Sequence, residues 1–266
     1  MNRPFPSSSS VNERQGGSLS ERLKRVRIVL SHTSHPGNIG AAARAMKTME
    51  LCRLFLVCPG KFPDPEAVAR AAGADDILRD AIVCRTLEEA LEGTVFTVAL
   101  SARHRNLGPQ RLQAREAAPL IVARAGEGDV ALVFGNETSG LSNADVQRCQ
   151  RTVFIPASPD YSSLNLGAAV QLLCYELRLA AHFGNPPEVS RTVPFASPPA
   201  TSDDVERFYA HLERIMIDTG FLDPHQPRRL MSKLRRLFGR ATLERDEINI
   251  LRGILDAVER KLPGKS

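Results

Sequence analysis

Short apolar runs alternate with segments of helical periodicity between about residues 26 and 182, and this alternation limits the possible folds more than any other feature of the chain. The apolar runs are Val26–Ser31, Leu54–Cys58, Ala81–Cys84, Val95–Leu100, Val130–Phe134 and Val153–Ile155. Runs that are this short and this apolar are typical of parallel strands buried on both faces. The alternation therefore predicts an α/β domain in which a parallel sheet has helices on both faces.

Two of the intervening segments show the helical pattern clearly. After the first run, the apolar side chains at helical spacing are Ile39, Ala42, Ala43, Met46 and Met49. After the last run they are Leu166, Ala169, Val170, Leu173 and Leu177. Asn38 stands where it can cap the first of these helices, and Ser163 and Asn165 precede the last helix, where each can act as its cap.

The last two apolar runs each break into a loop of small polar residues, over 135–141 and 156–165. In open α/β sheets, ligands bind in the crevice outside the carboxyl ends of the strands. Because small residues are frequent in these loops, backbone groups can approach a ligand closely, and Glu137 adds a carboxylate. The chain has neither a Gly-x-Gly-x-x-Gly turn nor a P-loop lysine pattern, so an adenosine-containing ligand would be held by these late loops.

These loop segments, 132–141 and 155–167, together with Asn38–Arg44, resemble the three motifs of the SPOUT (SpoU–TrmD) RNA methyltransferases. The resemblance runs from about Val26 to His182, continues in the tail, and is closest to the TrmJ branch of that superfamily. It implies a SPOUT-type sheet with a C-terminal trefoil knot, S-adenosylmethionine as methyl donor, and a homodimer. The implied reaction is methylation of the ribose 2′-hydroxyl of a tRNA anticodon-loop nucleotide, cytidine or uridine at position 32.

The resemblance also assigns roles to individual residues. Those implied to bind S-adenosylmethionine are Leu100, Ser101, Ala102, Gly135, Ile155, Ser162, Ser163 and Leu164. Those implied to be catalytic are Arg44, Asn38, Glu137, Ser163 and Asn165. Glu137 is expected to organise its loop by accepting hydrogen bonds from backbone amides, with a place in the RNA site as the alternative. Close relatives carry arginine where this chain has Asn136, a departure that bears on nucleotide preference.

The motif arginine of the family, here Arg44, is often assigned as the base for the ribose hydroxyl. A guanidinium has a pKa above about 12 and does not readily release a proton. We therefore expect Arg44 to clamp a phosphate of the target nucleotide bidentately and to stabilise the developing 2′-alkoxide. A solvent-facing arginine is the structural alternative.

Two other functions stay open at this point. One is 2′-O-methylation of ribosomal RNA, and the other is a catalytically silent RNA-binding protein built on the same fold. The joint presence of Arg44, Glu137, Ser163 and Asn165 argues against the silent protein. The helical tail favours a tRNA enzyme, since many enzymes of the family that act on ribosomal RNA carry an N-terminal RNA-binding domain instead.

Composition divides the chain into four parts. Residues 1–24, rich in serine, asparagine and glycine, lack the apolar run of a signal peptide and are predicted to be a disordered leader. The methyltransferase domain is predicted over 25–183. Prolines crowd residues 184–202, which predicts an extended linker, and 203–266 is predicted to be a helical tRNA-binding extension.

The tail shows three helical segments, near 203–219, 227–238 and 243–261. The first is amphipathic, and its apolar face carries Val205, Phe208, Leu212, Ile215 and Met216. Within the tail, basic residues gather in a stretch that contains no acid: Arg228, Arg229, Lys233, Arg235, Arg236 and Arg240. We expect the first five to contact the tRNA backbone, with a solvated helix face as the alternative.

Whole-chain composition adds limits on partners and compartment. The net charge of +5 and the pI of about 9.1 suit a polyanionic partner, for which we expect tRNA and not DNA. The five cysteines include no Cys-x-x-Cys and are predicted to be buried thiols in a reducing cytoplasm. No metal site is expected, because His32 and His35 have no nearby ligand residue, and no apolar run is long enough to span a membrane. A second copy is predicted to pack on the last helix of the domain, which is apolar around much of its circumference.

Overall fold

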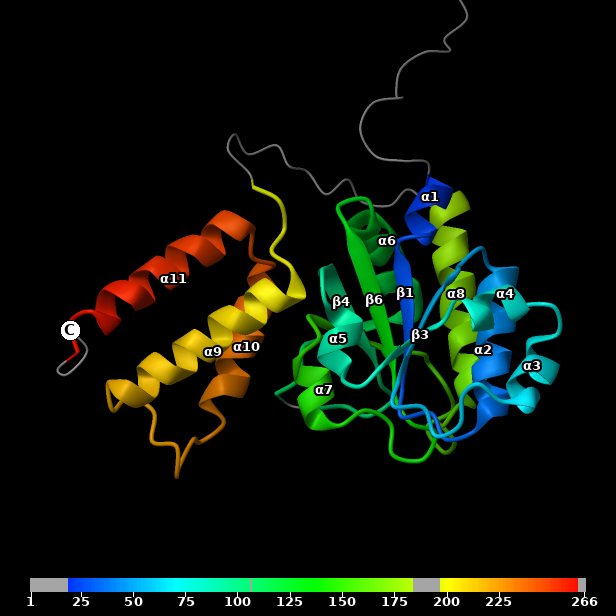
Figure 1. Cartoon of the computed structure of the whole chain (residues 1–266), viewed down its shortest axis with the longest axis horizontal. Coiled ribbons are helices and arrows are strands. Elements are labelled where there is room, and N and C mark those ends of the chain that lie inside the picture. Colours follow the sequence, from blue (N-terminus) through cyan, green and yellow to red (C-terminus); the bar gives the residue numbers. More distant parts are fainter. Residues whose placement is uncertain (1–18, 106, 184–196, 263–266) are drawn as a thin grey trace, which may run out of the picture.

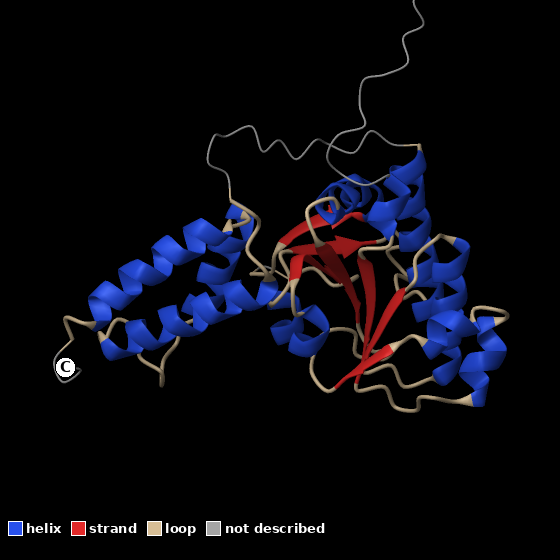
Figure 2. Cartoon of the chain, turned by 45° about the horizontal axis from the view of Figure 1, so that its top comes forward, coloured by secondary structure: helices blue, strands red, loops and turns tan. Residues whose placement is uncertain are grey.

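The computed structural model describes residues 19–105, 107–183 and 197–262. Its centre is a seven-stranded sheet in the order β3-β2-β1-β6-β4-β7-β5, and all paired strands run parallel. The strands are β1 (Val26–Ser31), β2 (Arg53–Val57), β3 (Ile82–Cys84), β4 (Thr94–Leu100), β5 (Gln110–Gln113), β6 (Asp129–Phe134) and β7 (Arg151–Phe154). The predicted parallel sheet is thus confirmed, and Figures 1 and 2 show it inside the larger body of the molecule.

Helices cover both faces of this sheet, as predicted. One face is covered by α1 (Leu19–Leu23), α2 (Pro36–Thr48), α6 (Ala114–Ala125) and α8 (Leu166–His182), with α3 (Pro65–Ala71) and α4 (Asp75–Arg79) beside α2. The other face is covered by α5 (Leu87–Leu91) and α7 (Asn143–Gln147). Alternation along β1 shows the division, because Ile28 and Leu30 join one core cluster and Val29 joins the other. The trefoil knot implied by the resemblance stays a prediction.

β5 is the strand that the sequence pattern did not predict. It lies at the edge of the sheet and pairs with β7 alone. Its sequence, Gln110-Arg111-Leu112-Gln113, is polar because an edge strand is not buried on both sides. A search for continuous apolar runs therefore passes over it.

The first helix of the domain, α2, begins before the residue that the sequence pattern indicated as its cap. Pro36 lies in the first turn, where its missing N–H removes no helical hydrogen bond, and His35 is the N-cap. The prediction that Asn38 caps α2 is therefore wrong. At α8 the cap is Asn165, whose side chain accepts a hydrogen bond from the backbone N of Ala168 over 3.3 Å.

Two further predictions need correction. The leader predicted to reach residue 24 overlaps α1, in which Leu23 is fully buried, while residues 1–18 lie outside the described residues. Three of the five free cysteines are buried as predicted, but Cys52 and Cys58 are exposed because they lie just beyond the two ends of β2.

The tail consists of α9 (Ser202–Asp218), α10 (Leu230–Ala241) and α11 (Arg245–Glu259), which Figure 1 shows beside the sheet domain. As predicted, the apolar face of α9 turns inward, and Phe208 packs edge-to-face on Phe238 with ring centroids 5.0 Å apart. Most of the predicted linker, 184–202, lies outside the described residues. In the ranges that the structure describes, no helix is long and apolar enough to cross a membrane.

Direct contacts join the tail to the sheet domain. Ser232 Oγ on α10 donates to Gln147 Oε1 on α7 over 3.1 Å. Arg151 Nη1 on β7 donates to the carbonyl oxygen of Gly239 over 3.0 Å. α10 therefore lies against α7 and β7, on the side of the domain where β5 forms the sheet edge.

Candidate functional site

A cavity of about 290 Å³ lies at the carboxyl ends of β4, β6 and β7, and we call it the strand-end cavity. Its lining includes all eight residues that the family resemblance assigned to the methyl donor: Leu100, Ser101, Ala102, Gly135, Ile155, Ser162, Ser163 and Leu164. Three loops that are distant in sequence thus meet at one edge of the sheet, where parallel α/β sheets bind ligands.

Gly135 shows why the loop after β6 needs a residue without a side chain. A Cβ on Gly135 would lie 2.2 Å from the carbonyl carbon of Gly140 and 2.3 Å from the backbone N of Leu141. Gly140 itself has a φ of +68°, in the left-handed region that glycine adopts readily. The loop therefore folds back tightly onto its own start and presents backbone to the strand-end cavity.

Asn136 closes the same loop. Its Nδ2 donates to the carbonyl oxygen of His32 over 2.7 Å, and its Oδ1 accepts from the backbone N of Thr138 over 2.8 Å. Asn136 thus ties the loop after β6 to the loop after β1.

Glu137 holds the two loops together from the other side. Its Oε2 accepts from the backbone N of Ser34 over 3.1 Å and from Ser34 Oγ over 2.9 Å, while Oε1 accepts from Asn38 Nδ2 over 2.8 Å and from the backbone N of His35 over 3.3 Å. Burial by itself raises the pKa of Glu137, but the donors from Asn38 and Ser34 outweigh it and lower the pKa to about 2. The carboxylate is ionised and its acceptor positions are in use, which is the organising role expected of it.

Asn38 links this carboxylate to the third motif. Its Oδ1 accepts from Asn165 Nδ2 over 2.9 Å, and Asn165 in turn caps α8. One chain of hydrogen bonds therefore runs from Glu137 through Asn38 and Asn165 to the start of α8. α2 and α8 are also packed closely there, since a Cβ on Gly167 would lie 2.7 Å from the Cβ of Ala41.

The structure separates Arg44 and Ser163, the other two residues assigned to catalysis. Ser163 lines the strand-end cavity. Arg44 is exposed on α2, does not line the cavity, and has no partner among the residues that the structure describes. Within one chain, the motif arginine is therefore free to meet a ligand or a second chain.

Arg105 is a site residue that the motif comparison missed. It lines the strand-end cavity and donates to Ser101 Oγ over 2.6 Å, to Asn143 Oδ1 over 2.9 Å and to the carbonyl oxygen of Leu141 over 2.8 Å. These neutral acceptors fix the guanidinium without cancelling its charge. The cluster Arg103-His104-Arg105 directly after the Ser101–Ala102 loop was the sequence signal that could have indicated it.

The basic residues of the tail fall into two groups. Arg228, Arg229, Lys233 and Arg236 are exposed, as contact with RNA requires. Arg235 instead pairs with Glu206, Nη2 to Oε2 over 2.7 Å, and its guanidinium lies 4.4 Å from the centroid of the Tyr209 ring. The expectation that Arg235 contacts tRNA is not supported, because its charge is used inside the tail.

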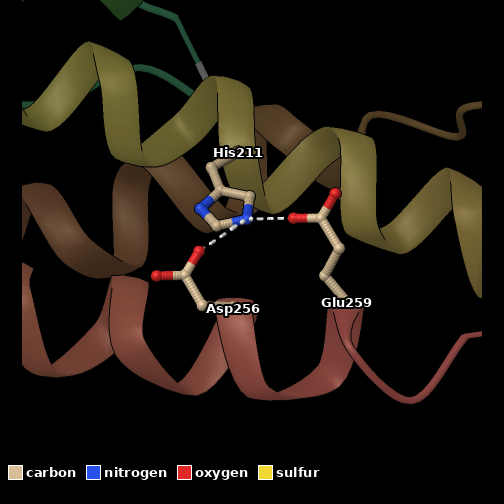
Figure 3. A group of neighbouring side chains, drawn as sticks. All are labelled: His211, Asp256 and Glu259. Carbon is tan, nitrogen blue, oxygen red and sulfur yellow. Dashed lines mark ion pairs between the residues drawn. The ribbon is translucent and has the colours of Figure 1, made fainter. Parts of the chain in front are cut away.

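A second group of titratable side chains lies between α9 and α11 (Figure 3). His211 Nε2 is 3.5 Å from Glu259 Oε2 and 3.7 Å from Asp256 Oδ1. Arg214 already binds both carboxylate oxygens of Glu259, over 2.6 Å and 3.0 Å. We assign this group to ion pairing between the two helices, since an adjacent guanidinium opposes cation binding.

The strand-end cavity suits an adenosine-containing methyl donor. Leu100, Ile155 and Leu164 offer apolar surface to a heteroaromatic ring, and the loop at Gly135 offers backbone groups. Glu137, the carboxylate among the described lining residues, is not free to act as a base, because it accepts hydrogen bonds from Ser34, His35 and Asn38. The arrangement can hold an activated donor and align an incoming nucleophile.

Comparisons with known proteins agree with this geometry. The SpoU rRNA methylase family model matches residues 25–175, and the model of the C-terminal domain of the tRNA methyltransferase TrmJ matches 203–266. The tRNA (cytidine/uridine/adenosine-2′-O-)-methyltransferase TrmJ of Pseudomonas aeruginosa is 51% identical over 250 residues, which cover 92% of this chain and 97% of that protein. The tRNA (cytidine/uridine-2′-O-)-methyltransferase TrmJ of Klebsiella pneumoniae is 48% identical over 91% of this chain and 100% of its own length.

Solved structures agree as well. The crystal structure of TrmJ from Z. mobilis ZM4 matches with a TM-score of 0.75 and 32% identity, and the match covers 88% of this chain and 98% of that chain. A probable methylase family protein from Haemophilus influenzae Rd KW20 matches with a TM-score of 0.59 and 43% identity over 90% and 97% of the two chains. The chain therefore belongs to the SpoU methylase family, and within it to the TrmJ proteins.

Proposed function

We propose that this chain transfers the methyl group of S-adenosylmethionine to the ribose 2′-hydroxyl of a tRNA nucleotide, at position 32 of the anticodon loop. The observation that carries the proposal is the meeting of three loops at the strand-end cavity, beside the hydrogen-bonded chain of Glu137, Asn38 and Asn165. The tRNA substrate is taken from the named activity of relatives about half identical to this chain. Position 32 rests on the family resemblance.

The protein's main task in this reaction is alignment. S-adenosylmethionine supplies an activated methyl group, so the residues have to bind the donor and bring the ribose hydroxyl into line with it. The backbone at Gly135 and the side chains of Leu100, Ile155 and Leu164 hold the donor in the strand-end cavity. Ser163 lines the same cavity, which supports its proposed role at the reacting groups.

Glu137, Asn38 and Asn165 act as positioning residues. None of them is free to take a proton, since Glu137 is ionised with four donors on it and the two amides have no basic group. Their hydrogen bonds fix the loop after β6 against the start of α2 and the start of α8. Arg44, exposed on α2, clamps a phosphate of the target nucleotide and stabilises negative charge on the 2′-oxygen.

A homodimer is part of the proposal. Ala168, Leu172 and Tyr175 are all exposed and follow one another at helical spacing, so they form one apolar stripe along α8. Leu172 is 41% and Tyr175 43% exposed, although both are large apolar or aromatic side chains. A second copy covering this stripe would remove it from water. Light scattering of wild-type protein should give twice the chain mass, and Leu172→Glu should give the monomer mass.

The reaction is tested with tRNA transcripts that carry a 2′-deoxyribose at one position. Wild-type protein should methylate the all-ribose tRNA and fail on the transcript with 2′-deoxyribose at position 32, while 2′-deoxyribose at position 33 leaves methylation intact. If methylation is lost only when 2′-deoxyribose stands at another position, that other nucleotide is the target. Methylation of ribosomal RNA but not of tRNA would support the ribosomal alternative. A tRNA substrate and free thiols also suit a reducing cytoplasm as the place of action.

A further inference from the structure

A second cavity, of about 390 Å³, opens beside the strand-end cavity, and we call it the arginine cavity. It lies where residues 103–105 and 108–109, strands β5 and β7, and helix α10 of the tail meet. The charged or buried polar side chains that matter in its lining are Arg103, Arg105, Arg111, Thr152, Arg236 and Arg240. Among the described residues, no aspartate or glutamate lines it.

Most of the positive charges around this cavity have no carboxylate partner among the described residues. In the parts of the chain that the structure describes, four of its arginines form no ion pair with a carboxylate: Arg103, Arg105, Arg111 and Arg240. Arg111 is held by the carbonyl oxygen of Ala102 over 3.1 Å and by the Phe154 ring, whose centroid is 3.7 Å from the guanidinium carbon. Neutral partners thus orient Arg105 and Arg111 and leave their charges available to an anion.

Neighbouring residues on α10 show that the arrangement is specific. Arg235 turns to Glu206 and Tyr209 inside the tail. Arg236 and Arg240, one and five positions further, line the arginine cavity instead. The cavity is therefore built by residues of both the sheet domain and the tail.

Two buried donors point to the same kind of ligand. Thr152 is only 5% exposed, and its Oγ1 has no hydrogen-bond partner in the described structure. The Nε of Arg111 is buried without a partner as well. Unpaired buried donors are unusual in folded proteins. A ligand that carries charge and offers only acceptor oxygens, as a phosphodiester does, suits both of them.

The position of the cavity relates it to the methylation site. Arg103 and Arg105 line both cavities, so the two are contiguous. We propose that the arginine cavity binds a backbone phosphate of the tRNA strand next to the nucleotide whose ribose is methylated. This inference deepens the proposed function and rests on it, and it gives α10 a role in placing the substrate strand beside the methyl donor.

The test removes one charge from the cavity and one from elsewhere in the tail. Arg240→Gln changes an exposed residue of the cavity, and Arg252→Gln makes the same change at an exposed residue of α11 outside it. Dissociation constants for tRNA are measured over a series of KCl concentrations. We expect Arg240→Gln to weaken binding about tenfold and to reduce the slope of log affinity against log salt by about 1. Arg252→Gln should change affinity less than about twofold with an unchanged slope.

Thr152→Val tests the buried hydroxyl separately. Because Oγ1 has no partner in the described structure, its removal should leave the melting temperature unchanged or raise it. Affinity for tRNA should nevertheless fall severalfold. Calorimetry with S-adenosylmethionine should give unchanged donor affinity in Arg240→Gln and Thr152→Val, which localises the loss to the RNA.

Several outcomes would overturn the inference. Equal tRNA affinity and salt slope in wild type and Arg240→Gln would do so, as would an equal loss in Arg252→Gln. Inorganic phosphate, titrated into wild type, tests a free anion as the occupant. Tight phosphate binding combined with unchanged tRNA affinity in Arg240→Gln would assign the cavity to free phosphate and reject the tRNA backbone.

Methyl transfer to tRNA is measured in the same samples. If wild type binds tRNA with the expected dependence on Arg240 but transfers no methyl group, the proposed function fails while the phosphate site stands. If wild type methylates tRNA and Arg240→Gln binds it normally, only the phosphate site fails.

Discussion

Asn38 Nδ2 donates a hydrogen bond to Glu137 Oε1 over 2.8 Å, and the two residues are 99 positions apart in the chain. The contact places the first turn of α2 against the loop after β6. Since Asn38 also accepts from Asn165, the positions of three separate loops depend on two neutral amides and one carboxylate. Removal of the Glu137 carboxylate can be tested by measuring how the free energy of unfolding depends on pH.

Glu137→Gln should destabilise the protein by about 1–2 kcal/mol at pH 7, after allowance for solvent screening of a partly exposed group. The pKa of Glu137 is lowered from 4.5 to about 2 in the folded state. Its contribution is therefore complete above about pH 4.5 and is lost as the pH falls toward 2. Urea unfolding of wild type and variant at pH 7 and pH 3 measures this, and the difference should shrink at pH 3.

The matched control for that experiment is Glu92→Gln, which removes an exposed carboxylate from the end of α5. It should change the free energy of unfolding by less than about 0.5 kcal/mol. A Glu137→Gln protein as stable as wild type at pH 7, or a difference that grows on acidification, would contradict the positioning role.

Arg44→Ala should lower the rate of methyl transfer by roughly 10²-fold or more, because the proposed contacts are to RNA and to charge that develops in the transition state. Donor affinity and melting temperature should stay near wild type, since Arg44 is exposed outside the strand-end cavity. Arg44→Lys should restore little, because an ammonium cannot make a planar bidentate contact. Single-turnover transfer, calorimetry and thermal unfolding separate these effects, and near wild-type transfer by Arg44→Ala would reject the assignment.

Gly135→Ala should weaken S-adenosylmethionine binding by more than about tenfold. The added Cβ would lie 2.2 Å from backbone of Gly140, and backbone cannot move aside as a flexible side chain can. Gly253→Ala is the control, because a Cβ there meets nothing within 4 Å. In the middle of α11 that change should stabilise the protein by about 0.5–1 kcal/mol and leave donor binding unchanged. Calorimetry that gives equal donor affinity for both variants would contradict the proposed role of the loop.

The parts of the fold that depend on burial were predictable from the sequence. Six strands lie close to the predicted apolar runs, and four of them, β1, β2, β4 and β6, are buried along nearly their whole length, which their apolar composition indicates. β3 was also predicted from its apolar residues, although it is an exposed edge strand. β5 was not predicted, because an edge strand can form without an apolar run. The cap of α2 was misplaced because Asn38 has the right chemistry for a cap, whereas the signal that marks the start is Pro36 two positions before it.

The site was predictable to the extent that motifs bring loops together. The strand-end cavity contains every residue that the resemblance assigned to the donor. The local sequence could not predict the hydrogen-bond partner of each polar group. Glu137 and Asn38 are far apart in the chain, so their hydrogen bond could not be predicted from local sequence. Likewise, no residue near Arg105 in the sequence indicates that Asn143 and Leu141 are its acceptors. In the basic run of α10, charge alone does not say which arginine turns inward.

Arg235 and Lys233 separate stability from RNA binding within that run. Arg235 pairs with Glu206, and although burial opposes it, the hydrogen bond to Glu206 raises the pKa of Arg235. Arg235→Gln leaves Glu206 half-buried without this partner and should destabilise the tail by about 1–3 kcal/mol. Lys233 is exposed, so Lys233→Gln should cost less than about 0.5 kcal/mol.

For tRNA binding, Lys233→Gln should have the larger effect and Arg235→Gln the smaller one, the reverse of their effects on stability. Lys233→Gln should weaken tRNA binding severalfold and lower its salt slope, because an exposed ammonium on α10 contacts phosphate. Arg235→Gln, measured at a temperature where the tail is folded, should retain the wild-type salt slope, since that charge is already paired with Glu206. Thermal unfolding and binding over a KCl series give both quantities. A normal melting temperature together with a reduced salt slope in Arg235→Gln would show that Arg235 leaves Glu206 to bind RNA, and the original expectation for this arginine would then stand.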